Sequence, residues 1–233
     1  MIGIMKCFIL ISSKQNAGFR KTVTASIAAA RREGRRNRKP IVICADSGIH
    51  LIYPEIAADY LIGDFDSIKP QILKQAQRSA AEIIKYPAEK DFTDFHLALE
   101  LAVSAKRRPS EIIVYGGLSG RLDQTLANIF TAACFSIEYK IKISLHETRT
   151  SVYLLNRHFK TLEIKENIKP GDTISLRPLF KRVKVKSGAG LKYPLKNDII
   201  NCVDTRGISN EAYERKISLE IASGELIAVH IRR

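Results

Sequence analysis

The stretch Tyr60-Leu61-Ile62-Gly63-Asp64-Phe65-Asp66-Ser67 passes from a short apolar run into a turn that carries two carboxylates. Helix-like sequence begins near Ile68, so the turn joins a buried strand to a helix. Two carboxylates at this spacing are costly to bury, but they suit a magnesium ion held against a phosphate chain. The stretch therefore predicts one strand–turn–helix unit of an α/β sheet, with a candidate metal site at the end of the strand.

The same alternation runs through residues 1–147. Short runs rich in Ile and Val, without polar alternation, are typical of strands buried on both faces. The expected strands are residues 7–11, 41–45, 60–62, 82–86, 111–115 and 141–145. Apolar residues recur at helical spacing between them, as in the sets Phe19/Val23/Ile27, Phe95/Ala98/Leu99/Ala102 and Leu122/Leu126/Ile129/Ala133. This pattern predicts a mostly parallel sheet covered by helices on both sides.

Beyond residue 148 the pattern changes to short strands separated by Gly or Pro turns, with no long helix. The expected strands are residues 150–155, 173–179, 182–187, 214–221 and 226–231. We therefore expect an α/β fold of two domains. Residues 1–148 would form a mostly parallel α/β sheet domain, and residues 149–233 a smaller all-β sandwich domain.

The chain is basic, with 38 Lys+Arg against 24 Asp+Glu and a formal charge of +14. This charge fits either a nucleic-acid-binding protein or a protein whose substrate carries phosphates. The densest basic run, residues 31–39, follows a helix-like segment, so we interpret it as a solvated helix end and loop. Aromatic residues, 7% of the chain, are not interleaved with the basic runs, which disfavours nucleic-acid binding.

The cysteines and the hydropathy of the chain bear on metal sites, disulfides and membrane segments. The four cysteines are far apart and form no CxxC pair, which disfavours a zinc site or a disulfide framework. No apolar run is long enough to span a membrane, and residues 1–11 are interpreted as a first strand rather than a signal peptide. We expect a cytoplasmic protein without membrane or nucleic-acid partners.

Four consecutive expected strands end in turns that carry Asp, and ligands of open parallel sheets bind beyond the carboxyl ends of the strands. The turns are Asp46-Ser47-Gly48, Gly63-Asp64-Phe65-Asp66, Asp91-Phe92-Thr93-Asp94 and Gly116-Gly117-Leu118-Ser119-Gly120-Arg121-Leu122-Asp123. Taken singly, such residues are also explained as helix caps, with Thr93 or Asp94 capping one helix and Ser67 another. Four such turns at one rim indicate instead a shared divalent metal, because clustered carboxylates repel one another.

The glycines of the last turn would let backbone N–H groups approach a phosphate, and Arg121 can add a bidentate contact. The turn is no Walker A loop, and the chain has neither a GxSxG elbow nor an HExxH pair. The residues alone therefore predict a metal-dependent enzyme that acts on a phosphate-bearing substrate.

Residues 45–48, 63–67, 91–94 and 120–128, in this order, resemble the motifs of the thiamine pyrophosphokinase family. The C-terminal stretches Gly190-Leu191-Lys192-Tyr193-Pro194-Leu195 and Thr205-Arg206-Gly207-Ile208-Ser209-Asn210-Glu211 are similar to its thiamine-binding domain. The resemblance implies a Mg²⁺-dependent transfer of the pyrophosphoryl group from ATP to thiamine, giving thiamine diphosphate and AMP. It also implies a homodimer whose active site lies between the catalytic domain of one subunit and the thiamine-binding domain of the other.

The resemblance further implies roles for individual residues. Catalytic roles fall to Asp46, Asp64, Asp66, Asp94 and Asp123. Asp64, Asp66 and Asp94 would bind Mg²⁺. ATP would meet Thr93, Gly116, Gly117, Gly120 and Arg121. Thiamine would face Ser209 and Asn210, with Tyr193 as a candidate stacking residue. The sequence does not choose between Asp94 and Asp66 as acceptor of the hydroxyl proton.

Two alternatives stay open at this point. A pyrophosphokinase for another alcohol, such as a hydroxymethylpterin, would share the acidic rim, although Gly207-Ile208-Ser209-Asn210 favours thiamine. A basic nucleic-acid-binding protein is the more distant alternative. The family commonly has Ala-Asp-Gly-Gly followed by Ala-Asn, and Ser47 and His50 depart from that pattern, which affects the expected contacts of this turn.

Overall fold

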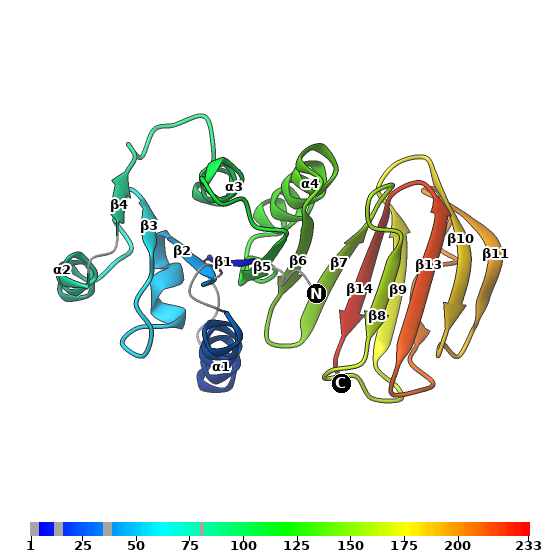
Figure 1. Ribbon diagram of the computed structural model, residues 1–233. Helices are drawn as coiled ribbons and strands as arrows, with labels where there is room; N and C mark the ends of the chain where they lie inside the picture. The colour runs from blue at the N-terminus through cyan, green and yellow to red at the C-terminus, as the bar shows by residue number, and fades with distance from the viewer. Residues whose placement is uncertain (1–4, 12–15, 35–38, 80–81) are drawn as a thin grey trace. The chain divides into compact units, whose positions relative to one another are not determined.

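The computed structural model describes residues 5–11, 16–34, 39–79 and 82–233 (Figure 1). The chain forms two compact units, Met1–Phe135 with Leu145–Thr148, and Ser136–Ser144 with Arg149–Arg233. The first is an α/β sheet unit and the second a β-sandwich unit, as the sequence predicts. The basic run at residues 31–39 lies partly outside the described residues, so its predicted loop is only described at its ends.

The first unit alternates strands and helices. The elements of this alternation are β1 (Lys6–Leu10), α1 (Ala17–Glu33), β2 (Ile41–Ala45), the 3₁₀ helix η1 (Asp46–Leu51), β3 (Tyr60–Gly63), α2 (Pro70–Arg78), β4 (Glu82–Lys85), α3 (Asp94–Ser104), β5 (Glu111–Tyr115), α4 (Leu122–Tyr139) and β6 (Lys142–His146). The end of α4 and the start of β6 fall in the second unit. The strand order is β6-β5-β1-β2-β3-β4, and β1, β2, β3, β4 and β5 pair in parallel. All six strands predicted in this part of the sequence are confirmed to within two residues at each end.

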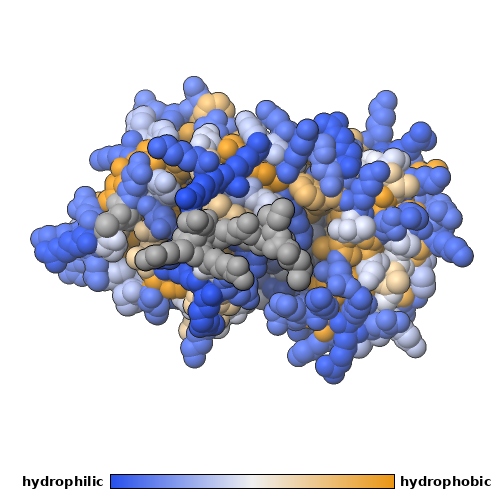
Figure 2. All heavy atoms as spheres, in the orientation of Figure 1, coloured by the Kyte–Doolittle hydropathy of each residue, from blue (hydrophilic) through white to orange (hydrophobic). Residues whose placement is uncertain are grey.

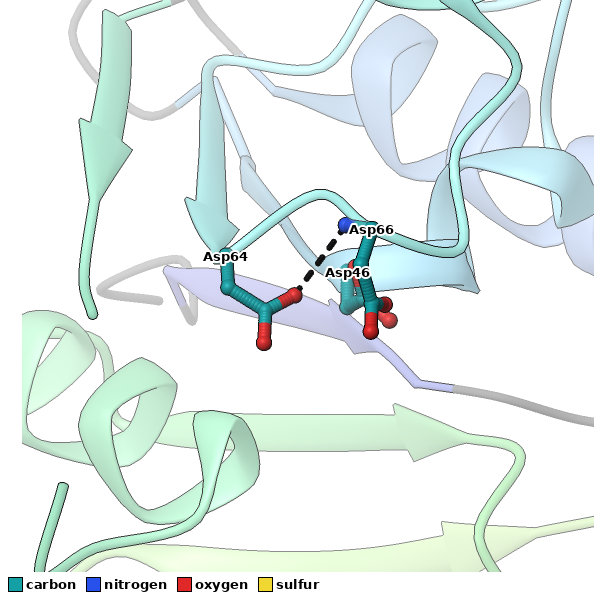
Figure 3. A group of neighbouring side chains, drawn as sticks. All are labelled: Asp46, Asp64 and Asp66. Atoms are coloured by element: carbon teal, nitrogen blue, oxygen red, sulfur yellow. Dashed lines mark hydrogen bonds between the residues drawn. The ribbon is translucent and has the colours of Figure 1, made fainter. Parts of the chain in front are cut away.

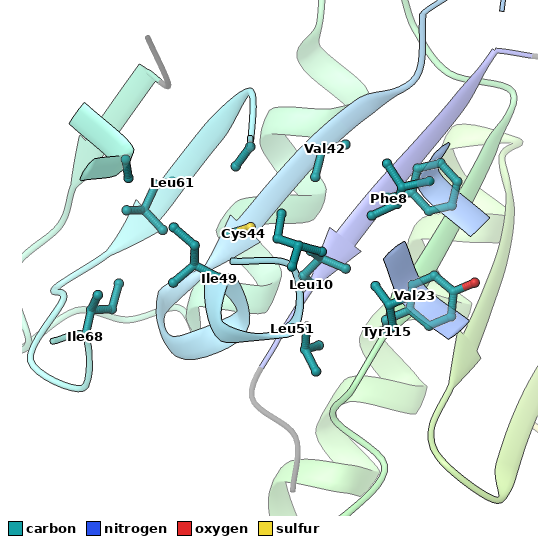
Figure 4. Packing of buried hydrophobic residues seen from close by; sticks show 14 of the residues in the cluster. Phe8, Leu10, Val23, Val42, Cys44, Ile49, Leu51, Leu61, Ile68 and Tyr115 are labelled. Carbon is teal, nitrogen blue, oxygen red and sulfur yellow. The ribbon is translucent and has the colours of Figure 1, made fainter. Parts of the chain in front are cut away.

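Apolar side chains on both faces of this sheet form the core. On the face shown in Figure 4, Phe8, Val42 and Leu61 from the strands meet Val23 of α1 and Ile49 of η1. Helices α1 and α2 lie on that side of the sheet, and α3 and α4 on the other (Figure 1). Strands covered on both faces need no polar alternation, which is why their sequences read as continuous apolar runs.

A close backbone contact holds η1 against the sheet. A Cβ at Gly48 would lie 2.1 Å from the carbonyl oxygen of Leu10. Only glycine permits this approach, because any side chain would collide with the backbone of β1. The contact fixes the turn that begins at Asp46, directly after β2.

The second unit is an antiparallel sandwich. Its elements are β7 (Thr150–Leu155), β8 (Thr161–Ile164), β9 (Thr173–Pro178), β10 (Arg182–Ala189), β11 (Leu195–Asn201), β12 (Asn210–Glu211), β13 (Ile217–Ser223) and β14 (Leu226–Ile231). Within the unit the strand orders are β12-β9-β14-β7 and β11-β10-β13-β8. Inward residues of β10, Val183 and Val185, pack in the core, while Arg182, Lys184 and Lys186 face solvent.

Some sequence predictions miss the observed elements. Strands β8, β11 and β12 were not predicted, and β11 contains Asn197 at a φ of 53°, a conformation that strand patterns do not signal. The predicted buried face of α4 is also wrong in its first two turns, because Leu122 is 72% exposed and Leu126 is 47% exposed. The predicted faces of α1 and α3 are confirmed: Phe19, Val23 and Ile27 are buried, as are Phe95, Ala98, Leu99 and Ala102.

The surface agrees with the basic composition. Figure 2 shows a face that is mainly hydrophilic, with smaller hydrophobic areas between the charged side chains. None of the helices in the described part of the chain is both long and apolar enough to cross a membrane. Of the four free cysteines, Cys7 and Cys44 are buried in the sheet, and burial raises the pKa of both thiols.

A buried hydrogen bond joins His230 and Asp172 in the sandwich. His230 on β14 is 1% exposed, and its Nε2 lies 2.8 Å from Oδ2 of Asp172. Asp172 also accepts the backbone N–H groups of Lys169 and Arg233. Burial lowers the pKa of His230, with Arg232 adding to that effect and Asp172 opposing it. Burial would raise the pKa of Asp172, but the hydrogen bonds from His230, Arg233 and Lys169 outweigh it and lower that pKa.

Both shifts predict loss of stability in acid. The unfolded chain binds protons more readily than the folded chain at both groups. His230 therefore favours unfolding as the pH falls below about 6.5, and Asp172 does so only below about 4. We expect a lower unfolding temperature at about pH 5.5 than at about pH 7.5, measured by circular dichroism. His230→Gln, which can donate to Asp172 but does not titrate, should weaken this dependence. Unchanged acid sensitivity in the variant would exclude the pair as its source.

Candidate active site

A cavity of about 600 Å³ opens at the carboxyl ends of the strands in the first unit. The strand order reverses between β1 and β5, and ligands of open α/β sheets bind at such a switch point. The lining residues come from the segments after β1, β2, β3, β4 and β5: Ile11, Ala45, Asp46, Asp64, Ala88, Lys90, Asp91, Phe92, Thr93, Asp94, Phe95, Gly117, Ser119, Gly120, Arg121, Gln124 and Asn128. The predicted rim is therefore one side of a real cavity.

Three carboxylates from two neighbouring strands converge here. One oxygen of each of Asp46, Asp64 and Asp66 lies within 4.8 Å of the others. Figure 3 shows Asp64 accepting the backbone N–H of Asp66, at 3.1 Å. Between them Phe65, at a φ of 70°, packs its ring in the core of the sheet. Because Phe65 is anchored inward, the two flanking aspartates remain at the rim.

The cluster has the chemistry of a site for a hard cation. Among the described residues, no Lys or Arg forms an ion pair with Asp46, Asp64 or Asp66. Asp46 Oδ2 accepts the hydroxyl of Ser67, whereas its Oδ1 is buried with no hydrogen-bond partner in the part of the chain described. Carboxylate oxygens suit Mg²⁺, and Asp46 Oδ1 has no donor among the described residues, so the cluster fits the ion that the sequence predicts.

Asp94 lies in the same cavity in a different setting. It is the first residue of α3, and its Oδ1 lies 3.1 Å from Nζ of Lys90. Burial raises the pKa of Asp94, Lys90 opposes that rise, and the charges of Asp46 and Asp64 add to it. Thr93 caps α3 by accepting the backbone N–H of His96 at 3.2 Å. Of the three predicted metal ligands, Asp64 and Asp66 thus lie together with Asp46, and Asp94 pairs with Lys90.

The glycine loop follows β5 and borders the cavity. Gly116, Gly117 and Gly120 have φ values of 95°, 75° and 101°. Arg121 lines the cavity and forms a bidentate pair with Asp123, at 3.1 Å from Nε and 2.5 Å from Nη2. Asp123 itself is not part of the lining, and it lies where it can orient the guanidinium.

The predicted thiamine residues lie together in the second unit. Asn210 is buried, its Oδ1 accepts the backbone N–H groups of Tyr193 and Glu211, and its Nδ2 donates to the carbonyl of Tyr193. Ser209, at a φ of 59°, donates its backbone N–H to Ser175. Tyr193 is 62% exposed. Asn210 therefore holds the loop that presents Tyr193.

Comparison with known proteins gives the same family for both units. A family model described as thiamin pyrophosphokinase, catalytic domain, matches residues 35–145. A second, described as thiamin pyrophosphokinase, vitamin B1 binding domain, matches residues 160–226. Thiamine pyrophosphokinase of Bacillus subtilis is 32% identical over 167 residues, which are 72% of this chain and 75% of that protein.

The chain belongs to the thiamine pyrophosphokinase family. Thiamine pyrophosphokinase 1 of rice is 25% identical over 217 residues, 84% of this chain and 81% of that protein. Among solved structures, thiamine pyrophosphokinase of B. subtilis shares the fold with a TM-score of 0.77 at 23% identity, covering 98% of this chain and 99% of that chain. Thiamin pyrophosphokinase of Candida albicans has a TM-score of 0.73 at 19% identity, covering 98% and 89%.

Membership of the thiamine pyrophosphokinase family confirms the predicted reaction class. The chain is a transferase of thiamine diphosphate biosynthesis that uses ATP as pyrophosphoryl donor and thiamine as acceptor. A pterin pyrophosphokinase and a nucleic-acid-binding protein find no support in these comparisons.

Several lining residues of this family member were given no role from sequence. Lys90 stands four residues before Asp94, a spacing that signals an ion pair at a helix start. Phe92 is half-exposed and stacks on His96, with ring centroids 4.4 Å apart. Asn128 on α4 ends a stretch that resembles a family motif, but its contact with the glycine loop is visible only in three dimensions.

The two departures from the usual family pattern lie on η1. Ser47 and His50 lie on either side of Gly48. The residue whose backbone lies against β1 is Gly48, so a side chain at Ser47 does not disturb this contact. Burial lowers the pKa of His50, and the charges of Lys69 and Arg20 contribute, against Asp46.

Asn210→Ala should destabilise the second unit. The substitution removes the hydrogen bonds of Asn210 to part-buried backbone groups of Tyr193 and Glu211, which costs about 1–3 kcal/mol in the free energy of unfolding. Urea unfolding measures this loss. Tyr193→Phe is the matched control, because the exposed phenol changes while the backbone contacts remain. Equal stability of Asn210→Ala and the control would show that Asn210 does not hold the loop.

Proposed function

We propose that pyrophosphoryl transfer from ATP to thiamine takes place at the cavity of the first unit, with Mg²⁺ held by Asp46, Asp64 and Asp66. The observation that carries this proposal is the convergence of three carboxylates, within 4.8 Å of one another and without a basic partner in the described chain, beside a glycine loop. When bound, the ion would neutralise charge on the phosphate chain and align it for attack.

The residues around the cluster suit the remaining steps. Arg121, held by Asp123, would bind a phosphate with two parallel hydrogen bonds, and the glycines would admit the phosphates close to the backbone. Asp94 is our candidate for the acceptor of the hydroxyl proton of thiamine. Its raised pKa makes it a better base than an ordinary carboxylate, and Lys90 favours its ionised form. Thr93, as the N-cap of α3, would hold the start of the helix that carries Asp94.

The thiamine side of the site is assigned to the second unit. Ser209 would contact thiamine, Tyr193 would stack on one of its rings, and Asn210 would hold Tyr193 in place. We further propose a domain boundary between residues 148 and 149, and a homodimer in which the first unit of one subunit meets the second unit of the other. A cytoplasmic location fits the demand for ATP and belongs to this proposal.

Asp64→Asn and Asp66→Asn should each lower turnover by at least about 100-fold, because losing a metal ligand costs more than losing the groups that support it. Turnover is measured as AMP release from ATP and Mg²⁺ that depends on thiamine. Mg²⁺ should raise the unfolding temperature of the unaltered protein and have little effect on that of either variant.

Glu89→Gln is the control for these variants. The substitution removes one exposed negative charge near the same rim, and Glu89 does not line the cavity. It should keep turnover and the stabilisation by Mg²⁺. Full activity of Asp64→Asn or Asp66→Asn would place the metal elsewhere. Unfolding of either variant without Mg²⁺ would assign the residue a structural role instead.

A shared active site can be tested by mixing two inactive proteins. Asp64→Asn disables the first unit, and Ser209→Trp fills the expected thiamine position in an exposed turn. If each site combines units from two subunits, random exchange yields mixed dimers with one intact site, and activity should recover to about a quarter of the unaltered value. Light scattering should report a dimer. A mixture that stays inactive although the subunits exchange would locate each site within one chain.

A further inference from the structure

The loop between β5 and α4, residues 116–121, contains three glycines, but hydrogen bonds to other elements hold its backbone in place. Gly116, Gly117 and Gly120 adopt φ values of 95°, 75° and 101°. Glycine visits both signs of φ at little cost, so a loop with three glycines would sample many backbone arrangements if nothing held it. A phosphate site needs one arrangement, because backbone N–H groups must already point at the anion.

Two buried polar side chains, one on α4 and one after β6, hold this loop. Asn128 is 8% exposed, and its Nδ2 donates to the carbonyl of Gly117 at 3.0 Å. Glu147 is 6% exposed, and its Oε2 accepts the hydroxyl of Ser119 at 3.1 Å. A backbone bond from Gly116 N–H to the carbonyl of His146, at 2.9 Å, anchors the start of the loop. Hydrogen bonds thus hold the loop at Gly116, Gly117 and Ser119.

The contact of Asn128 sets the direction of one peptide plane. In a trans peptide the carbonyl of Gly117 and the N–H of Leu118 point in opposite directions. Since the Asn128 amide group donates to this carbonyl, a flipped plane would turn a second N–H donor toward it and leave both donors unpaired. Asn128 therefore selects which polar group of this peptide faces away from α4.

Close packing adds to this constraint. A Cβ at residue 117 would lie 2.1 Å from Cδ1 of Ile11 and 2.8 Å from Nδ2 of Asn128. The backbone of the loop thus lies directly on the two side chains, and both of them line the cavity that holds Arg121. Glycine at position 117 is needed for this approach as well as for its positive φ.

We propose that Asn128 and Glu147 are positioning residues for the phosphates of ATP. Asn128 orients the Gly117–Leu118 peptide, and Glu147 acts through Ser119, so that the glycine loop is preorganised before the nucleotide binds. This inference rests on the proposed function, which assigns the loop to ATP.

The test compares variants in steady-state kinetics and in direct binding of a non-hydrolysable ATP analogue. Asn128→Ala and Ser119→Ala should each raise the KM for ATP, and the Kd of the analogue, about two- to tenfold, the effect of one lost hydrogen bond. The KM for thiamine should change less than twofold, because the lost hydrogen bond lies at the loop assigned to ATP. Glu147→Ala should raise the KM for ATP at least as much as Ser119→Ala, and the double variant should be no worse than Glu147→Ala alone, because Ser119 acts through its bond to Glu147. Glu147→Gln, which keeps an acceptor oxygen, should retain the KM for ATP.

The control is Ser136→Ala on the same helix. Ser136 is fully buried and accepts a hydrogen bond from Asn156 at 2.9 Å, away from the loop. It should lower the unfolding temperature without changing the KM for ATP. If Asn128→Ala and Ser119→Ala show only that loss of stability, the positioning role is overturned. If Asn128→Ala fails to fold, the hydroxyl deletion at Ser119 decides the question.

Arg121→Ala separates failure of this inference from failure of the proposed function. A raised KM for ATP in Arg121→Ala, with no change in Asn128→Ala and Ser119→Ala, would overturn the bracing role alone. An unchanged KM for ATP in Arg121→Ala would remove the loop from the nucleotide site and overturn both.

Discussion

Mutual repulsion among Asp46, Asp64 and Asp66 is the constraint on which the site depends. Like charges this close are held together only if the surrounding structure opposes their separation. Core packing supplies these opposing contacts. Phe65, between Asp64 and Asp66 in the sequence, packs in the core, and Gly48 packs η1, which begins at Asp46, against the backbone of β1. Core packing thus maintains an arrangement of charge that a divalent cation would stabilise.

The parallel sheet explains why so many functional groups meet in one cavity. Strands β2, β3, β4 and β5 all end at the same edge, so each following segment contributes residues to it. The reversal of strand order beside β1 leaves room there, and the glycine loop and α4 border that space. Among the described residues no basic side chain pairs with Asp46, Asp64 or Asp66, whereas Asp94 pairs with Lys90 and Arg121 lines the same cavity.

Much of this arrangement follows from local sequence. Apolar runs predict the strands of the first unit, and Asp-bearing turns after them predict the rim, because both signals depend on neighbouring residues and on a general rule for parallel sheets. Contacts between distant segments carry no such signal. The bond of Asn128 to Gly117, the acceptance of the Ser119 hydroxyl by Glu147, and the solvent exposure of Leu122 on α4 all depend on tertiary packing. Strand β11 was missed because its polar residues interrupt the alternation, and β8 was missed because its alternation covers only four residues.

Crystals of the protein grown with Mn²⁺ and a non-hydrolysable ATP analogue would test the central claim most directly. Anomalous scattering locates the metal independently of any assumption about its ligands. The account predicts a peak roughly 2 Å from carboxylate oxygens of Asp64 and Asp66, with Asp46 in the same coordination sphere and the phosphates beside the glycine loop. A metal peak elsewhere, with these three aspartates lacking a cation while the nucleotide is bound, would contradict it.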